Sequence, residues 1–175
     1  MKEKISLYLV ATVKRIGALW VGFLVSMVPV YVCRANIYDI DTRNVVEPIV
    51  TSVIILLMSV IFLLFLYRID DHAAKLDNKD VFHLVVVPTL IHLLICVITA
   101  FTKNLIVIST GMGYIFINLL EPGANGVAEL SAGAKILASL VVATIPALGV
   151  WLGCLSARKK RQKESAMLHK KSTRR

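Results

Sequence analysis

The stretch LVVVPTLIHLLICVITAF, Leu84 to Phe101, decides the fold of this chain, because it contains no acidic residue, lysine or arginine. An α-helix rises about 1.5 Å per residue, so about 17 to 25 apolar residues cross the roughly 30 Å of hydrocarbon in a lipid bilayer. The stretch meets this test. It therefore predicts a membrane-spanning helix.

Three other stretches, 16–33, 49–67 and 136–155, pass the same test of length and composition. Hydrophobic residues make up 57% of the 175 residues, above the roughly 45–50% of soluble domains. The expected fold class is all-α: an integral membrane four-helix bundle. It forms one domain, residues 1–156, with a tail at 157–175. Asp80 is the predicted N-cap of the third span.

A fifth apolar stretch, 105–120, is shorter than the other four and carries a Gly111-Met112-Gly113 break. Irregular backbone at membrane depth is tolerated only where protein or water satisfies its polar groups. We expect a short re-entrant or interfacial segment between the third and fourth spans, because a fifth crossing would move the C-terminus to the other side.

The positive charges predict the orientation of the chain. With four spans, one side of the membrane carries sixteen of the 20 Lys and Arg residues, including nine in the tail. Lys and Arg in short loops stay cytoplasmic. Both termini are therefore expected in the cytoplasm, and the chain in a cell membrane, either a plasma membrane or a bacterial inner membrane.

Small residues recur at helical spacing in the first and fourth spans, where they predict close helix packing. Ordinary packing is the preferred interpretation, and dimerisation through the GxxxG pair is the alternative. The residues of this predicted packing set are Gly22, Ser26 and Pro29 in the first span and Ser139, Ala143, Gly149 and Gly153 in the fourth.

The third span carries a polar face about 80° wide, by the 3.6-residue helical period. An ionisable residue near the middle of a span normally turns toward the bundle interior, so His92 is expected inside. Pro88, one turn earlier, frees backbone groups near this ring. We favour a neutral histidine bonded to a hydroxyl or to a freed carbonyl over a role in proton or substrate handling. The predicted polar face is Thr89, His92, Cys96, Thr99 and Lys103.

The loop from Tyr67 to Leu84 is the most polar internal segment. Its acids and histidines are interleaved with Arg68, Lys75 and Lys79, so we interpret it as a solvated connector. It completes no recognised metal-ligand pattern, and the chain has no GxSxG, HExxH, P-loop or Rossmann motif. We assign no catalytic residue, no metal and no cofactor. The acids and histidines of the loop are Asp70, Asp71, His72, Asp77, Asp80 and His83.

The polybasic tail is expected to bind anionic lipid headgroups, at about 1 kcal/mol per cation near the surface. Its headgroup-binding residues are Arg158, Lys159, Lys160 and Arg161. The net charge of +9 does not indicate nucleic acid here, because it is concentrated beside apolar spans. The expected partners are the anionic bilayer and another membrane protein or a second copy of this chain.

Three functions are compatible with this sequence. The preferred one is a non-enzymatic small subunit that assembles with, stabilises or regulates a larger membrane complex, in transport or in the cell envelope. The alternative is a small homo-oligomeric transporter or channel that uses the face around His92. The third is a membrane-embedded enzyme that processes lipids with the Asp70–His83 loop.

Overall fold

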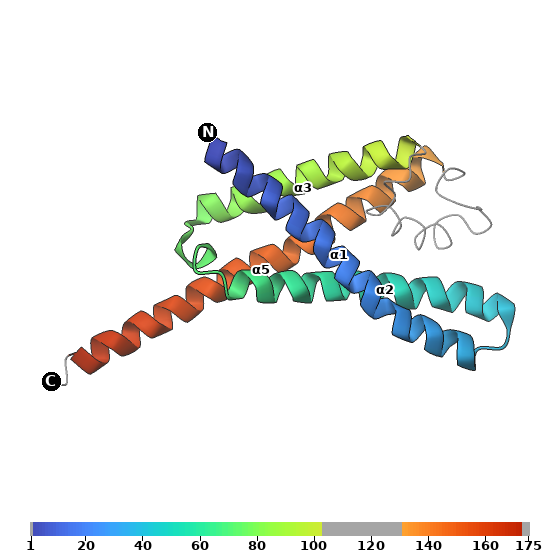
Figure 1. Cartoon of the computed structure of the whole chain (residues 1–175), viewed down its shortest axis with the longest axis horizontal. Helices are drawn as coiled ribbons and strands as arrows, with labels where there is room; N and C mark the ends of the chain where they lie inside the picture. Colours follow the sequence, from blue (N-terminus) through green and yellow to red (C-terminus); the bar gives the residue numbers. More distant parts are fainter. Residues whose placement is uncertain (1, 103–130, 173–175) are drawn as a thin grey trace.

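The computed structural model describes residues 2–102 and 131–172, and each regular element in these two ranges is a helix. Four of the helices are long and apolar enough to cross a membrane. The predicted segment 105–120 lies outside the described residues. The elements are α1 (Lys2–Asn36), α2 (Ile40–Arg68), the short 3-10 helix η1 (Ala73–Lys75), α3 (Asn78–Phe101) and α5 (Ala132–Ser172), as Figure 1 shows.

The helix boundaries differ most from the predicted spans at the two ends of the chain. The predicted span 49–67 matches the apolar part of α2, Ile49–Arg68. By contrast, α1 begins at Lys2 and α5 continues to Ser172. Lys, Arg, Glu and Gln are good helix formers, so charged residues end an apolar run without ending the helix. The first basic residues after Ala157 therefore lie in α5.

Two aspartates cap the helices that follow short loops. Asp39 precedes α2 and accepts a hydrogen bond from the backbone N–H of Thr42 at 3.0 Å. Asp77 precedes α3 and accepts one from the backbone N–H of Asp80 at 2.7 Å. Asp80 is thus inside the first turn of α3, and the expectation that it forms the N-cap is wrong by three residues.

The helices form two antiparallel pairs that cross each other. α1 pairs with α2 and α3 pairs with α5, and the two pairs diverge toward the α1–α2 connection (Figure 1). α2 packs on both α1 and α5, and α5 packs on both α2 and α3. α5 is the most buried of the four long helices, because half of its most apolar window is buried, against 22–28% for the other three.

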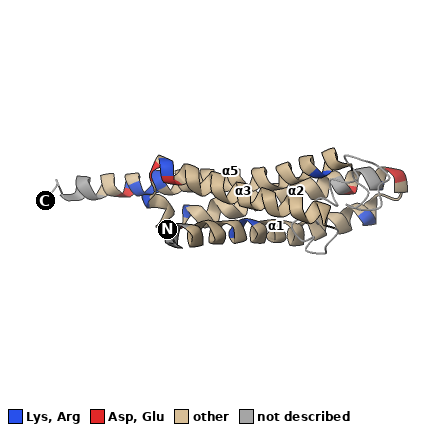
Figure 2. Ribbon diagram, turned by 90° about the horizontal axis from the view of Figure 1, so that it is seen from above, with Lys and Arg blue, Asp and Glu red and all other residues tan. Residues whose placement is uncertain are grey.

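Charged residues lie mainly toward the two ends of the molecule, and its middle is largely uncharged (Figure 2). Apolar side chains fill the contacts between helices. One buried cluster includes Leu63 and Tyr67 of α2 with Val150 and Cys154 of α5. This arrangement suits a chain whose central part lies in hydrocarbon.

Candidate functional site

The most unusual group inside the structure is the guanidinium of Arg15, which has no exposed surface. One terminal nitrogen donates hydrogen bonds to the carbonyl oxygens of Leu84 and Val85, at 3.2 and 2.9 Å. The other donates to the hydroxyl oxygen of Thr89. Arg15 thus ties α1 to the first half of α3.

Pro88 explains why α3 offers an acceptor at this position. In a regular helix the carbonyl of Leu84 would accept the N–H of residue 88, but proline has no N–H. The carbonyl oxygen is therefore free inside the helix, and the guanidinium of Arg15 supplies the missing donor. A proline and an arginine 73 positions apart in the chain form one structural unit.

Among the side chains that the structure describes, no carboxylate pairs with Arg15. The neighbouring Lys14 lies instead toward the polar end, 3.9 Å from the Asp70 carboxylate and over the ring of Tyr67. The charge of Arg15 is therefore met by two carbonyl dipoles and a hydroxyl. Charge-assisted bonds of this kind are stronger than neutral ones, which suits a helix-to-helix contact.

His92 lies on the same face of α3 as Pro88, and it is also fully enclosed. Neither ring nitrogen has a hydrogen-bond partner among the described residues, and the same holds for Nε of Arg15. The sequence interpretation gave His92 a hydroxyl or a freed carbonyl as its partner. Among the described residues, the imidazole has no such partner. Arg15, not His92, binds the carbonyl that Pro88 frees.

The other members of the predicted polar face differ in their surroundings. Thr89 lies half-buried, accepts from Arg15 and donates to the carbonyl of Val85 at 2.6 Å. Cys96 is buried. Thr99 donates to carbonyls of its own helix, those of Ile95 at 2.9 Å and Cys96 at 3.0 Å. Lys103 lies outside the described residues.

The predicted packing glycines lie against α2. A Cβ atom added at Gly22 would lie 2.5 Å from the carbonyl oxygen of Ile55, and one added at Gly149 would meet the backbone of Val60. At Gly153 the added atom would lie 2.7 Å from Cβ of Tyr67. The GxxxG pair of α5 therefore faces a helix of the same chain.

The remaining small residues of the predicted packing set follow the same helices. Ser26 is buried in α1, and Pro29 is half-buried further along it. Ser139 and Ala143 are buried in α5. Ser26 and Ser139 donate to carbonyls of their own helices, at 2.7 and 2.8 Å. Their hydroxyls therefore need no partner from another helix.

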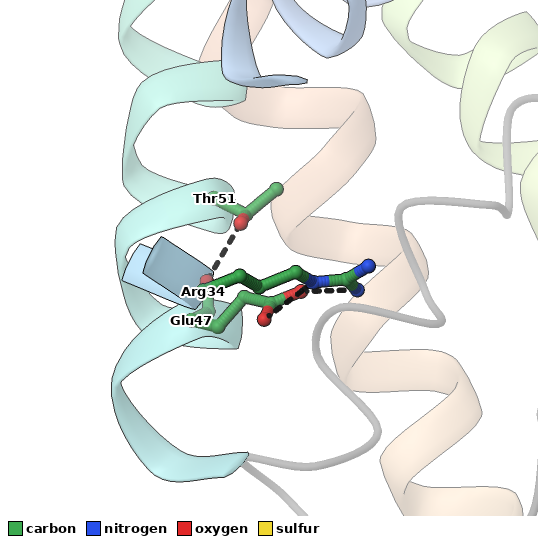
Figure 3. A network of polar contacts seen from close by, with 3 residues as sticks. All are labelled: Arg34, Glu47 and Thr51. Atoms are coloured by element: carbon green, nitrogen blue, oxygen red, sulfur yellow. Dashed lines mark hydrogen bonds and ion pairs between the residues drawn. The ribbon is translucent and has the colours of Figure 1, made fainter. Parts of the chain in front are cut away.

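An ion pair joins α1 and α2 near their connection. Nε and a terminal nitrogen of Arg34 donate to the carboxylate of Glu47, at 2.8 to 3.2 Å, and the hydroxyl of Thr51 donates to the Glu47 carbonyl at 2.6 Å (Figure 3). The sequence patterns did not predict this pair. The thirteen positions that separate the two residues become contiguous only once the hairpin is known.

The polar loop before α3 uses its carboxylates for local structure. Asp70 accepts hydrogen bonds from the backbone N–H groups of His72 and Ala73, at 2.9 and 3.4 Å. Within the described part of the chain, which includes this whole loop, no group of three His, Cys, Asp or Glu residues could hold a metal ion. A polar pocket of about 230 Å³ lies between the loop and α5, and its lining includes Asp71, Lys160 and Arg161.

No protein-family model, no curated protein and no solved structure shows a significant match to this chain. The described structure is all-helical, and four of its helices are long and apolar enough to cross a membrane. A buried arginine joins α1 to α3. These features are compatible with a multi-pass membrane protein.

Proposed function

We propose that this chain is a non-enzymatic subunit that crosses a cell membrane four times, with both termini in the cytoplasm, and that it assembles with, stabilises or regulates a larger membrane complex. The observation that carries the proposal is the small share of α1, α2 and α3 that the chain buries by itself, 22–28% of their most apolar windows. Most of their apolar surface is available to lipid or to another membrane protein.

The outer half of α1 is the clearest such surface. From Leu24 onward, α1 continues beside α2 with Leu24, Val28 and Tyr31 exposed, and Val28 and Tyr31 are 69% and 75% accessible. Helices pack in membranes through van der Waals contact and through small or polar residues. The exposed side chains of Leu24, Val28 and Tyr31 are suited to contact with lipid chains or with a partner helix.

The contacts of the polar groups support an assembling role over a chemical one. Arg15 is occupied by carbonyls of α3, and the carboxylates of Asp70 and Asp77 accept backbone N–H groups. His92 is enclosed without exposed surface. Neither the transporter alternative around His92 nor the lipid-processing alternative at Asp70–His83 gains a specific observation in its favour.

The proposal is tested by purifying the tagged full-length chain from its native membranes in mild detergent and identifying the accompanying proteins by mass spectrometry. We expect one unrelated membrane protein at fixed stoichiometry that is missing from a control purification of another tagged membrane protein of similar size. Recovery of the chain alone, or only as oligomers of itself, would contradict an assembling role.

A further inference from the structure

An apolar groove of about 450 Å³ runs between α3 and α5. Several of its wall residues are strongly exposed, including Phe82 at 61% and Leu148 at 51%. The groove thus opens onto the outer surface of the helix pair. Its apolar walls include Phe82, Val85 and Val86 of α3 and Leu148, Trp151 and Leu155 of α5.

Two polar residues line the groove together with these apolar walls. Arg158 of α5 donates a hydrogen bond from its guanidinium to the side-chain oxygen of Asn78, in the first turn of α3, at 2.5 Å. Both residues line the groove, and Arg158 is half-buried. Lys159, Lys160 and Arg161 follow directly on α5, so the groove meets a concentration of positive charge where α5 leaves its apolar section.

Trp151 indicates how deep in the membrane the polar end of the groove would lie. Tryptophan is enriched where membrane hydrocarbon meets the headgroups, and Trp151 lies on α5 two turns before Arg158. A ligand in the groove would therefore have its apolar part among hydrocarbon-facing residues and its polar part at a guanidinium. Arg recognises phosphate by charge-assisted, often bidentate hydrogen bonds.

We propose that this groove is a specific site for one anionic phospholipid, whose acyl chain lies between α3 and α5 and whose phosphate binds Arg158. Charge complementarity selects this occupant, because the polar end of the groove is cationic and its walls are apolar. The inference relies on the membrane insertion in the proposed function but not on a protein partner.

Native mass spectrometry of the full-length chain, released from mixed micelles, tests the site. The probes are phosphatidylglycerol and phosphatidylcholine with identical acyl chains. We expect one phosphatidylglycerol to stay bound per chain under conditions that remove phosphatidylcholine. Equal retention of both lipids would overturn the proposal, since it would indicate ordinary boundary lipid. Insertion is checked separately by flotation with liposomes, so a chain that fails to insert is distinguished from an inserted chain without the site.

Arg158→Gln removes the proposed phosphate ligand, and Lys79→Gln is its matched control. Both changes remove one charge near the polar end of the groove, but Lys79, in the first turn of α3 beside Asn78, is not among the residues that line the groove. We expect about a tenfold loss of phosphatidylglycerol affinity for Arg158→Gln, as for the loss of one charge-assisted contact, and a change within about twofold for Lys79→Gln. Equal losses would mean nonspecific attraction to positive charge and would overturn the site.

Val86→Trp fills the groove from the α3 side, and Val53→Trp on the exposed face of α2 is its control. We expect the first change to reduce phosphatidylglycerol retention at least about fivefold, because the acyl chain and the indole compete for one space, and the second to leave it unchanged. Should the Val86→Trp protein fail to give a monodisperse peak, Phe82→Ala removes an exposed wall and is expected to weaken retention. Unchanged retention in the folded groove variant would overturn the proposal.

Discussion

The guanidinium of Arg15 lies 3.2 Å from the carbonyl oxygen of Leu84, the backbone acceptor that Pro88 leaves without its helical donor. The relationship joins a charge on α1 to a helix irregularity on α3. It gives both residues one role, because the proline creates an acceptor and the arginine satisfies it.

The first prediction concerns the coupling between Arg15 and Pro88. Arg15→Leu leaves buried carbonyl oxygens without their donor, and we expect it to lower the free energy of unfolding by about 1–3 kcal/mol. In the Pro88→Ala background, residue 88 supplies its own N–H to Leu84. The cost of Arg15→Leu should then fall by about 1 kcal/mol. Unfolding in mixed detergent micelles, followed by circular dichroism, measures all four proteins of this cycle.

Lys14→Leu is the control for the cycle. Lys14 is next to Arg15 in the chain, but its ammonium group contacts the carboxylate of Asp70 and the ring of Tyr67 instead of α3. Its effect should add to that of Pro88→Ala without coupling. Additive effects of Arg15→Leu and Pro88→Ala would show that the two residues do not act through one carbonyl.

The second prediction concerns His92. Both ring nitrogens are buried without a hydrogen-bond partner among the described residues, and an unsatisfied buried polar group costs about 1–3 kcal/mol. His92→Leu should therefore raise the free energy of unfolding. The control is His83→Leu, a half-buried histidine in the same helix, which should change it by less than about 0.5 kcal/mol. Clear destabilisation by His92→Leu would mean that the imidazole is satisfied by a bond.

The third prediction compares glycines in two surroundings. Alanine at Gly22 or Gly149 would press its Cβ into the α2 backbone, so each change should destabilise the fold by about 1–3 kcal/mol. Gly17 lies in the same helix as Gly22, with open space where a Cβ would be. Gly17→Ala should be neutral or stabilising by up to about 1 kcal/mol, as in a helix interior. Thermal unfolding of the three variants checks the ranking, and equal effects at Gly17 and Gly22 would refute it.

The fourth prediction concerns pH and the start of α2. Hydrogen bonds from Thr42 hold the pKa of the Asp39 carboxyl below its usual value. A carboxyl with a lowered pKa in the folded state stabilises the fold above its unfolded pKa of about 3.9. This contribution disappears as the pH falls through the folded pKa. Asp39→Ala should lower the thermal midpoint at pH 7 and have a smaller effect in strong acid, and an equal effect at both pH values would contradict this prediction.

Apolar length alone was enough to predict that four helices could cross a membrane. The stretch 49–67 differs by one residue from the candidate span of α2, Ile49–Arg68, and the stretch 84–101 lies within that of α3, Asn78–Phe101. Hydrocarbon thickness sets a minimum apolar length for both. The ends of α1 and α5 were not predictable in this way, since hydropathy registers where apolar residues stop and says little about where a helix stops.

The site was predictable only on the α3 side. The sequence position of Pro88 predicts a carbonyl without its helical donor. The position of His92 predicts a polar side chain in the middle of a span, where its burial costs free energy. The donor to the Leu84 carbonyl is Arg15 of another helix, α1. No local sequence pattern specifies which helix packs against this part of α3. Arg15 is one of the sixteen Lys and Arg residues that the charge rule places on the cytoplasmic side, and that rule does not consider hydrogen-bond partners. The structure buries Arg15 completely.

The proposed four crossings of the membrane are tested by the location of the two termini. An epitope tag is placed at each end of the full-length chain, and protease protection is measured in sealed vesicles of known orientation. Both tags are expected on the cytoplasmic side, because an even number of crossings returns the chain to its starting side and the excess of Lys and Arg favours the cytoplasm for that side. Termini on opposite sides would contradict four crossings.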